Sequence, residues 1–327
     1  MISLHTIPKR HDSSLDVSTV APSKLSVITW SSGDSSFYET CKAIAVGTSG
    51  RVIGGWSDGV MFNAFSTGGG ITASINSPGL VTGAGAGLNK YFLCDAGGIR
   101  VSVTGTDVNW QVVSAITGIK SFSSDQYYIL GGGIGGNIVM SQDGITWSSL
   151  IKIPGGNILS VANYSNGIYM VAGTSNLLAR STNLNTWVGV TPKFTSSSVD
   201  NIVNITYSNI DKRFVAIRRD GCISISPDGT VWSAIVPIND DGLSTAVVNC
   251  AVYSNINTTT PAYVLGCNSG VVYVSYDLLK WKRVVLGLSL SGATNNTTNI
   301  LTLATNGNGA FYLGGTDRAV ACFTLQP

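Results

Sequence analysis

Short apolar runs alternate with turn-forming residues along the whole chain. Runs at 168–173, 214–217 and 262–266 are four to six residues long, and Gly, Ser, Asn or Asp separates each from the next run. Short runs bounded by turn residues are typical of antiparallel strands joined as hairpins. The pattern therefore predicts an all-β meander with four strands in each repeat, which we letter a to d in chain order.

One heptapeptide recurs between these runs and ends in an aromatic residue. The clearest copies read S-Q-D-G-I-T-W at 141–147 and S-P-D-G-T-V-W at 226–232. Weaker copies lie at 56–62, 104–110, 181–187 and 275–281, and the copy at 56–62 has Phe62 in the place of Trp. We expect each copy to form the turn between strands c and d, so that the aromatic residue begins strand d.

The spacing of these aromatic residues predicts the architecture. They lie at 62, 110, 147, 187, 232 and 281, which gives intervals of 48, 37, 40, 45 and 49 residues. Four strands in every 40 to 50 residues are the signature of a β-propeller. The sequence therefore predicts an all-β propeller of four-stranded antiparallel blades.

The two ends of the chain together supply one further blade. After Trp281, strand-like runs near 299–305, 310–314 and 318–324 provide only strands a, b and c, while 26–31 contains Thr29-Trp30 without a preceding turn motif. We expect 26–31 to pair with 318–324, because that pairing closes the ring and covers exposed strand edges. The prediction is thus a seven-bladed propeller.

The predicted domain division follows from this closure. Residues 1–22 are polar and form an N-terminal arm, and residues 23–327 form a single propeller domain with d strands near 30, 62, 110, 147, 187, 232 and 281. The arm carries the basic pair Lys9 and Arg10. We expect it to be held by its own propeller or by a neighbouring subunit.

Composition excludes several functions. Charged residues make up only 11% of the 327 residues, Glu39 is the only Glu, and the only histidines are His5 and His11. A Ser-His-Asp triad or a His-ligated metal in the propeller is therefore excluded. The net charge of +2, without a basic stripe, argues against nucleic acid.

Membrane and secretion signals are also missing from the sequence. No run reaches the roughly 18 apolar residues of a spanning helix, and the first residues lack the apolar core of a signal peptide. The six cysteines show no paired spacing, so we expect reduced thiols in a protein made in a host cytoplasm.

The polar and aromatic positions of the heptapeptide suit a structural role. An Asp or Asn side chain accepts N–H bonds from its own turn, Gly supplies a positive φ, and the aromatic ring packs between blades. We predict turn capping by Asp58, Asp143, Asn183, Asp228 and Asp277, and packing between blades by Trp30, Trp110, Trp147, Trp187, Trp232 and Trp281. We predict no catalytic, cofactor or metal site.

The heptapeptide resembles the Asp-box, or BNR, repeat of sialidase-like β-propellers, in a form one residue shorter than the full S-x-D-x-G-x-T-W. The resemblance runs from Trp30 to the end of the chain. It implies a propeller, in a family that includes sialidases, lectins, photosystem assembly factors, sorting receptors, and phage and bacterial surface proteins.

A sialidase needs residues that this chain does not provide. The Arg-Ile-Pro segment of that family is missing from the sequence, Tyr38 neighbours Glu39 instead of facing it, and most arginines stand singly. A sialidase-like glycoside hydrolase is therefore the third hypothesis, although a pair of Asp carboxylates remains open as a catalytic set.

The leading hypothesis is a non-enzymatic structural component of a tailed-phage virion, such as a tail, baseplate or capsid-decorating protein. Near-absent Glu, low charge and a Ser/Thr/Gly/Asn-rich β body resemble virion proteins. We expect contacts to other virion proteins through the arm and through long d-to-a loops near 63–78, 192–200, 237–246 and 286–298. Arg218 and Arg219, at a b-to-c turn, are candidate contact residues together with Lys9 and Arg10. The alternative is a lectin-like module that binds cell-surface glycans.

Overall fold

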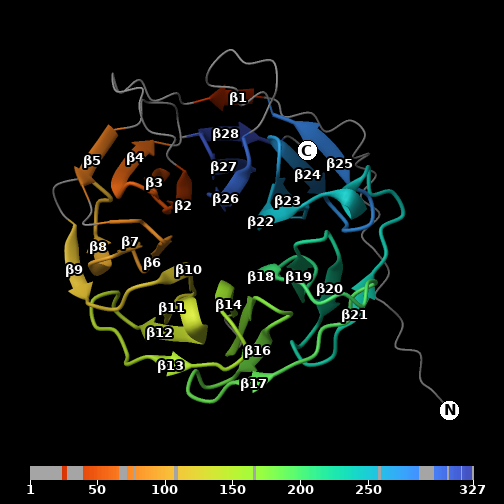
Figure 1. Ribbon diagram of the computed structural model, residues 1–327, viewed down its shortest axis with the longest axis horizontal. Helices are drawn as coiled ribbons and strands as arrows, with labels where there is room; N and C mark the ends of the chain where they lie inside the picture. Colours follow the sequence, from red (N-terminus) through yellow and green to blue (C-terminus); the bar gives the residue numbers. More distant parts are fainter. Residues whose placement is uncertain are drawn as a thin grey trace.

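Seven four-stranded antiparallel sheets are arranged in a ring in the computed structural model (Figure 1). The structure describes residues 24–27, 40–65, 72–76, 79–106, 110–164, 167–256, 259–286, 298–307, 309–317 and 319–325. Strand a of each sheet lies nearest the centre of the ring and strand d lies at its rim. The prediction of a seven-bladed β-propeller is confirmed.

The strands follow one another from the inside of each blade to the outside. Blade 1 consists of β2 (Cys41–Val46), β3 (Arg51–Trp56), β4 (Val60–Phe65) and β5 (Thr72–Asn76), and blade 2 of β6 (Gly83–Gly87), β7 (Lys90–Asp95), β8 (Gly98–Ser102) and β9 (Gln111–Ser114). Blade 3 consists of β10 (Ile119–Ser124), β11 (Ile129–Gly133), β12 (Asn137–Ser141) and β13 (Ile151–Lys152), and blade 4 of β14 (Ile158–Tyr164), β15 (Ile168–Gly173), β16 (Leu178–Ser181) and β17 (Val188–Gly189). Blade 5 consists of β18 (Ile202–Ser208), β19 (Arg213–Arg218), β20 (Ile223–Ser226) and β21 (Ser233–Ile235), and blade 6 of β22 (Val248–Asn255), β23 (Pro261–Cys267), β24 (Val271–Ser275) and β25 (Lys282–Val285). Two single-turn 3-10 helices are also described, η2 (Ile134–Gly136) and η3 (Leu243–Thr245).

The seventh blade joins the two ends of the described chain. Strands β26 (Ile300–Thr305), β27 (Ala310–Gly315) and β28 (Val320–Thr324) are completed by β1 (Lys24–Val27), which pairs antiparallel with β28. The register places Lys24 opposite Thr324 and Val27 opposite Ala321. The predicted closure is confirmed, with the N-terminal strand beginning two residues earlier than expected.

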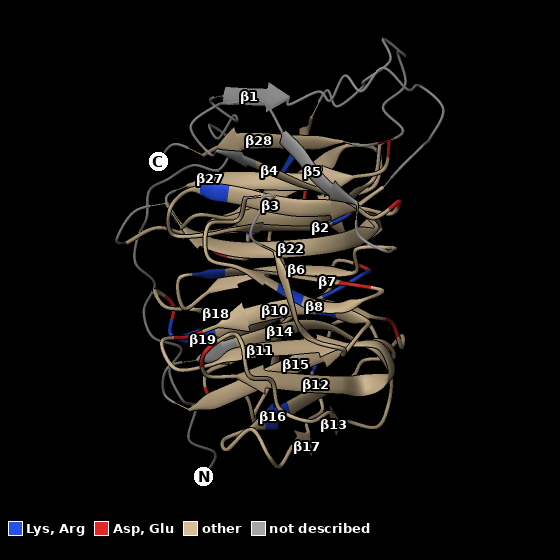
Figure 2. Ribbon diagram, turned by 90° about the vertical axis from the view of Figure 1, so that its left-hand side faces the viewer, with Lys and Arg blue, Asp and Glu red and all other residues tan. Residues whose placement is uncertain are grey.

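The b strands are buried on both faces because each blade lies between two neighbours. In β19, for example, every residue from Phe214 to Arg218 is buried, and the other b strands show the same continuous burial. This is the reason that these strands read as apolar runs instead of alternating patterns. The edge-on view shows few charged positions scattered over the ribbons (Figure 2).

Most of the inner strands share a β-bulge that the sequence pattern does not predict. In six of the seven inner strands that the structure describes, one extra residue forms a β-bulge directly after the first residue of the strand, at Lys42, Lys120, Leu159, Val203, Asn249 and Leu301. Strand β6, which reads Gly-Ala-Gly-Ala-Gly, pairs without a bulge. Polar side chains then link neighbouring inner strands, as where Asn204 Nδ2 donates to Ala251 O at 2.9 Å and Asn249 Nδ2 donates to Ile300 O at 3.0 Å.

The aromatic residues of the heptapeptides lie at the contacts between blades. Trp232 of blade 5 shares a buried cluster with Met170 of blade 4, and Trp281 of blade 6 shares one with Ile217 of blade 5. Trp147 and Trp187 likewise contact clusters that include residues of the preceding blade. Each ring therefore covers apolar surface that one blade alone would leave exposed.

Blade 1 differs from the prediction. Asp58 lies in the turn between β3 and β4, so it is a b-to-c turn, and Phe62 lies inside β4, the third strand of its blade. The predicted d strand near 62 is therefore wrong, since the outer strand is β5, and 63–78 is not a d-to-a loop. In this turn Asp58 Oδ1 accepts from Val60 N, as the Asp of a c-to-d turn accepts from the N–H two residues on, and this likeness explains the error.

Three of the predicted site residues lie outside the described part of the chain. These are Lys9, Arg10 and Trp30. The six cysteines form no disulfide, and burial raises the pKa of the Cys41 and Cys267 thiols to about 12. Within the described ranges, no helix has the length and apolar character needed to cross a bilayer.

Candidate functional site

The connections between strands divide the propeller into two faces. The a-to-b and c-to-d turns lie on one side, which we call the turn face, and the b-to-c turns and d-to-a connections lie on the other, which we call the loop face. On the loop face, two d-to-a connections of equal length are the longest described without a gap: 190–201, which joins β17 to β18, and 236–247, which joins β21 to β22. Loops on a rigid scaffold are where binding residues usually lie.

The 190–201 loop presents small hydroxyl side chains to solvent. Lys193 and residues 195–199 are exposed, and the side chain of Val199 is 72% exposed. Such a sequence, rich in serine, would ordinarily be flexible. On the side away from solvent, however, two of its main-chain carbonyls accept hydrogen bonds from one buried side chain.

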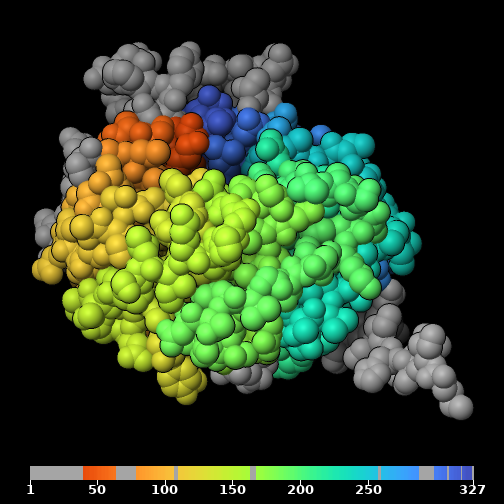
Figure 3. All heavy atoms as spheres, turned by 60° about the horizontal axis from the view of Figure 1, so that its bottom comes forward, coloured from red at the N-terminus to blue at the C-terminus, as the bar shows by residue number. Residues whose placement is uncertain are grey.

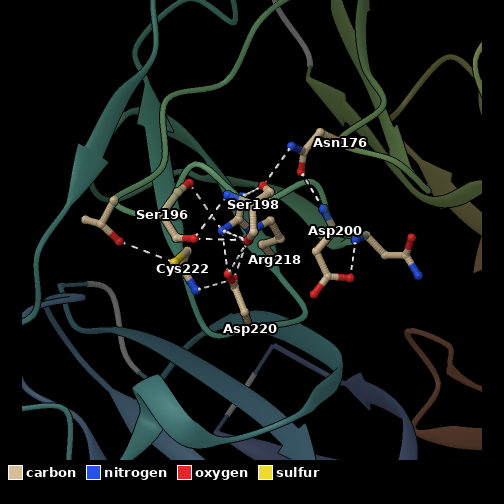
Figure 4. Close-up of polar contacts among 9 residues, drawn as sticks. Asn176, Ser196, Ser198, Asp200, Arg218, Asp220 and Cys222 are labelled. Carbon is tan, nitrogen blue, oxygen red and sulfur yellow. Dashed lines mark hydrogen bonds and ion pairs between the residues drawn. The ribbon is translucent and has the colours of Figure 1, made fainter.

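That side chain is Arg218, the last residue of β19, which is 1% exposed. Its Nη1 donates to the carbonyl of Ser198 at 2.6 Å, and its Nη2 donates to Ser198 Oγ at 3.1 Å and weakly to Ser196 O at 3.4 Å. Two further bonds run to Asp220, one of them from Nε to Oδ1 at 2.9 Å. Figure 4 shows the guanidinium between the loop and the Asp220 turn.

The ion pair with Asp220 sets the charges of this cluster. Burial alone would raise the pKa of Asp220, but hydrogen bonds from Arg218 and from the Cys222 N–H, together with the guanidinium charge, lower it overall. The Asp220 carboxylate in turn raises the pKa of Arg218. The guanidinium carbon also lies 4.6 Å from the centre of the Phe194 ring, a cation–π contact. The pair is therefore ionised, and its guanidinium bonds Ser196 and Ser198 within the exposed part of the loop.

The b-to-c turn of blade 4 holds the other side of the loop. Asn176 N donates to Asp200 O at 2.8 Å, and the Asn176 side chain bonds the Ser198 carbonyl and the Asp200 N–H at 3.4 Å each (Figure 4). Asn201 Oδ1 accepts from Ser175 N at 3.3 Å. The loop is thus fixed between two neighbouring blades, so its exposed surface has a defined shape before any partner arrives.

The two arginines predicted as contact residues have different positions. Arg219 is exposed, and its main chain bonds Asn201 O and Val248 N. Arg218 has almost no exposed surface that could contact a partner, because the 190–201 loop covers its guanidinium. The structure therefore replaces the contact role expected for Arg218 with a positioning role, and leaves Arg219 and Lys193 as the exposed cations beside the loop.

A second d-to-a connection, 236–247, lies on the same face. Val236 and Ile238 are 68% and 70% exposed. Asp240 accepts from Gly242 N and Ser244 N, and the hydrogen bonds from Ser244 and Gly242 lower its pKa. Asp241 accepts from Arg283 N at 2.8 Å. Both carboxylates therefore hold the shape of this connection.

The turn face carries four turns with the same hydrogen bonds, which we call the Ser-x-Asp turns, at 141–147, 181–187, 226–232 and 275–281. In the first, Asp143 Oδ1 accepts from Ile145 N at 2.8 Å and Thr146 N at 2.7 Å, and Ser141 Oγ accepts from Gly144 N at 2.8 Å. Asn183, Asp228 and Asp277 accept from the equivalent N–H groups. The residue after each Asp or Asn has a positive φ, and it is Leu184 or Leu278 in two of the turns.

The tryptophans of these turns donate back to the turn itself. Trp187, Trp232 and Trp281 donate their indole N–H to the carbonyl three residues earlier, each at 3.1 Å. Trp147 instead makes edge contacts with Phe92 and Phe122, 5.8 and 5.9 Å between ring centres. Trp110 packs with residues of blade 1, and its preceding residues 107–109 lie outside the described part of the chain.

The residues that shape the loop face were only partly visible in the sequence. The Arg218-Arg219-Asp220 turn and the 192–200 loop could be found there, but the roles of Asn176 and Ser198 could not. These two come from segments about 20 residues or more away from their partners, and no local spacing marks them. Among the described residues, no group of three or more His, Cys, Asp or Glu side chains is placed to hold a metal ion.

No protein-family model and no curated protein sequence matches this chain. Solved structures do match. The extracellular domain of BT4673 from B. thetaiotaomicron superposes with a TM-score of 0.69 and 14% identity over 92% of this chain, which spans 40% of that longer chain. YCF48 from Cyanidioschyzon merolae gives 0.66 and 13% over 92% of this chain and 98% of its own.

These neighbours agree with the strand pairing described above. The chain is a seven-bladed β-propeller. A structure of YCF48 bound to D1 peptide also matches the propeller, with a TM-score of 0.66 and 12% identity over 93% of this chain and 97% of that one. At such identities the likeness shows the fold alone.

Proposed function

We propose that this propeller is a non-enzymatic scaffold that docks a protein partner through its loop face. The observation that carries the proposal is the 190–201 loop, whose exposed residues are held in one conformation by the buried Arg218. A preformed loop loses little conformational entropy when a partner binds, and this strengthens binding. The peptide held by YCF48, a protein of similar fold, supports the idea that such a scaffold can serve polypeptide recognition.

The docking surface combines features that suit a protein partner. Val199, with Val236 and Ile238 on the next connection, offers exposed apolar area, and the hydroxyls of 195–198 offer hydrogen bonds. Arg219 and Lys193 add positive charge at this surface. Apolar contacts surrounded by polar groups are the usual composition of protein interfaces.

The assembly that we propose for this propeller is a tailed-phage virion, with the protein made in the host cytoplasm and carried in the tail, baseplate or capsid decoration. Support comes from the single Glu, the 11% of charged residues and the body rich in Ser, Thr, Gly and Asn. The turn motif resembles the Asp-box of propellers that occur on phage surfaces. The N-terminal arm, with Lys9 and Arg10, is proposed as a second contact.

The test uses particles purified from the cells that produce the protein, with mass spectrometry and immunogold labelling as readouts. We expect the protein in the particles at a fixed ratio to the other structural proteins. Val199→Asp on the loop face should reduce incorporation at least tenfold, because the charge would lie in the interface. Val231→Asp, at a similarly exposed valine on the turn face, should incorporate as the wild type does.

The two parts of the proposal fail separately. A protein that is absent from purified particles contradicts the virion role. Normal incorporation of Val199→Asp, with loss of Val231→Asp, contradicts docking through the loop face and leaves the virion role standing.

A further inference from the structure

A strip of apolar side chains crosses the loop face of blades 2 and 3. We call it the apolar strip, and its members are Leu80, Ala96, Ala115, Ile116 and Ile134. Leu80 and Ile134 are 43% and 50% exposed, both alanines are exposed, and Ile116 is half-buried. The two blades, orange to yellow in Figure 3, pack side by side in the ring. The strip therefore offers aliphatic area to solvent across two neighbouring blades.

Contacts between loop-face segments make the strip continuous. A Cβ on Gly79, in the connection from blade 1, would lie 3.0 Å from Ala96 Cβ in the b-to-c turn of blade 2. A Cβ on Gly98, at the other end of that turn, would lie 3.0 Å from a Cα of the connection to blade 3. One on Gly118, in that connection, would lie 3.2 Å from Ile134 Cδ1, and Gly118 O accepts from Ile134 N at 3.0 Å. Each segment therefore touches the next.

Three exposed lysines lie beside the strip. Lys42 and Lys120 are the bulge residues at the loop-face ends of β2 and β10, and bulges redirect side chains. Among the inner-strand side chains that the structure describes, these two are the exposed ones. Lys152, in β13, is also exposed, and it adjoins the b-to-c turn of blade 3, where Gly136 O accepts from Ile153 N at 2.9 Å. None of the three ammonium groups bonds a described residue, so their charges are available to a partner.

The acidic side chains near the strip make contacts within the protein. Asp95 is fully buried, and its Oδ2 accepts from Arg100 Nε at 2.5 Å in an ion pair. Asp58, in the b-to-c turn of blade 1, is exposed, and its Oδ1 accepts from Val60 N at 2.9 Å. No other acidic residue lies at the loop face of blades 1 to 3 within the described ranges. The exposed lysines therefore outnumber the exposed acids, and an acidic partner would compensate their charge.

The combination of aliphatic area and separated cations selects the class of partner. Nucleic acid would need aromatic residues for stacking or a dense row of cations, and the strip has neither. An anionic membrane would need about four to eight clustered basic residues or interfacial aromatic side chains. A polypeptide with aliphatic and acidic side chains fits both parts of the surface, because it covers the apolar area and pairs its carboxylates with the lysines.

We propose that the apolar strip docks an acidic polypeptide segment, whose aliphatic side chains cover the strip and whose carboxylates pair with Lys42, Lys120 and Lys152. The strip and its lysines belong to blades 1 to 3, whereas the 190–201 loop joins blades 4 and 5. The inference rests on the proposed function only in so far as the partner of the loop face is a protein. It adds a second place of contact and the chemistry of the segment that binds there.

The experiment measures binding of labelled peptides to the whole chain by fluorescence anisotropy. The probe consists of three Glu-Leu-Glu-Ser repeats. Repeats of Glu-Ser-Glu-Ser, Gln-Leu-Gln-Ser and Lys-Leu-Lys-Ser remove the apolar side chains, remove the charge and reverse the charge. We expect the probe to bind saturably with a dissociation constant of about 0.1 mM or less, and each other peptide to bind at least about fivefold more weakly. Labelled single-stranded DNA and vesicles of phosphatidylcholine with phosphatidylserine test the other classes of partner.

Two matched double variants locate the site. Lys42→Ala/Lys120→Ala removes two exposed cations beside the strip and should weaken binding of the probe about five- to tenfold. Lys193→Ala/Arg219→Ala removes two exposed cations on the other part of the loop face and should leave binding unchanged. Ile134→Asp should weaken binding about tenfold or more, because a like charge would face the carboxylates of the probe within the strip. All five side chains are exposed, so the variants should fold.

Several results would overturn the inference. They are no saturable binding of the probe, equal binding of the acidic and neutral peptides, tighter binding of DNA or vesicles, or a loss that occurs in Lys193→Ala/Arg219→Ala instead of Lys42→Ala/Lys120→Ala. Val199→Asp separates this test from the test of particle incorporation, since it should bind the probe as the wild type does. A failure of the probe therefore leaves docking through the other part of the loop face standing.

Discussion

At the scale of the residue, hydrogen bonds from backbone N–H groups lower the pKa of the Asp side chains in the Ser-x-Asp turns. The N–H groups of Ile145 and Thr146 hold the pKa of Asp143 well below its ordinary value, although the carboxylate is exposed. The pKa of Asp228 is also lowered, because N–H bonds from Thr230 and Val231 outweigh the opposing effect of burial. These carboxylates stabilise their turns more when they are ionised than when they are protonated, so the stability of the turns depends on pH.

The first prediction concerns Asp143 and acid. Because the folded-state pKa is lower than the unfolded-state value near 4, the unfolded chain binds the proton first as the pH falls, and stability is lost below about pH 4. Asp143→Asn keeps the N–H acceptor but cannot titrate. Urea midpoints at pH 6 and pH 3 should therefore differ less in this variant than in the wild type.

A converse variant controls that result. Asn183→Asp adds a titrating group to an equivalent turn and should enlarge the difference between the two pH values. Equal differences in all three proteins would contradict the role given to the N–H bonds.

The second prediction concerns the adjacent arginines of β19. Arg218→Ala removes a buried cation and leaves the Asp220 carboxylate and the loop carbonyls without their hydrogen-bond donor. It should therefore lower the free energy of unfolding by about 3–5 kcal/mol. Arg219→Ala changes an exposed side chain and should cost less than about 0.5 kcal/mol. Urea denaturation measures both values.

Limited trypsin digestion adds an independent readout, because Lys193 lies within the held loop. Cleavage there should become much faster in Arg218→Ala and remain at the wild-type rate in Arg219→Ala. Equal cleavage rates in the two variants would show that Arg218 does not hold the loop.

At the scale of the element, the inner strands are set by how closely neighbouring blades approach. Strand β6 packs against β10 so tightly that a Cβ on Gly83 would lie 2.6 Å from the carbonyl oxygen of Ile119, and one on Gly85 would lie 2.4 Å from Phe122 Cβ. Glycine in a strand usually weakens it. Here the close approach requires it, and β6 is also the inner strand that pairs without a bulge.

The third prediction follows from this contact. Gly83→Ala should destabilise the protein by about 1–3 kcal/mol, because backbone must move to admit the methyl group. Gly189→Ala, in strand β17, has nothing within 4 Å of the added Cβ and should stay within about 0.5 kcal/mol of the wild type. Thermal melting of both variants measures the difference, and equal stability would contradict the close packing of β6 on β10.

At the scale of the whole molecule, the ring is closed by four residue pairs between β1 and β28. Without β1, the edge of β28 would be open, and open strand edges recruit other chains. The closure joins residues almost 300 positions apart in the sequence. The unfolded chain therefore has a large conformational entropy that a covalent link between these residues would reduce. A covalent link at this seam should therefore stabilise the molecule.

The fourth prediction places that link at Ser26, which lies opposite the native Cys322. Ser26→Cys should form a disulfide under mild oxidation and raise the unfolding free energy by up to about 4 kcal/mol, since the loop it closes is long. The mass change and the melting temperature with and without a reductant measure this. In Ser26→Cys/Cys322→Ser the effect should vanish, and a Ser26→Cys protein that stays reduced would contradict the register.

The sequence by itself determined the features that depend on local spacing. The Ser-x-Asp turns follow from hydrogen bonds within seven residues, and their interval of 40 to 50 residues predicts the blades. The missing d strand was predicted near the N-terminus at 26–31 from Thr29-Trp30, and the structure has this strand at Lys24–Val27. Only the tertiary structure decided which side chains meet across blades: the turn at Asp58 looks like a c-to-d turn but joins b to c, and Arg218 looks exposed but is covered by a loop about 20 residues earlier. The physical reason is that capping needs only neighbours in the chain, whereas burial depends on which residues of separate blades pack together.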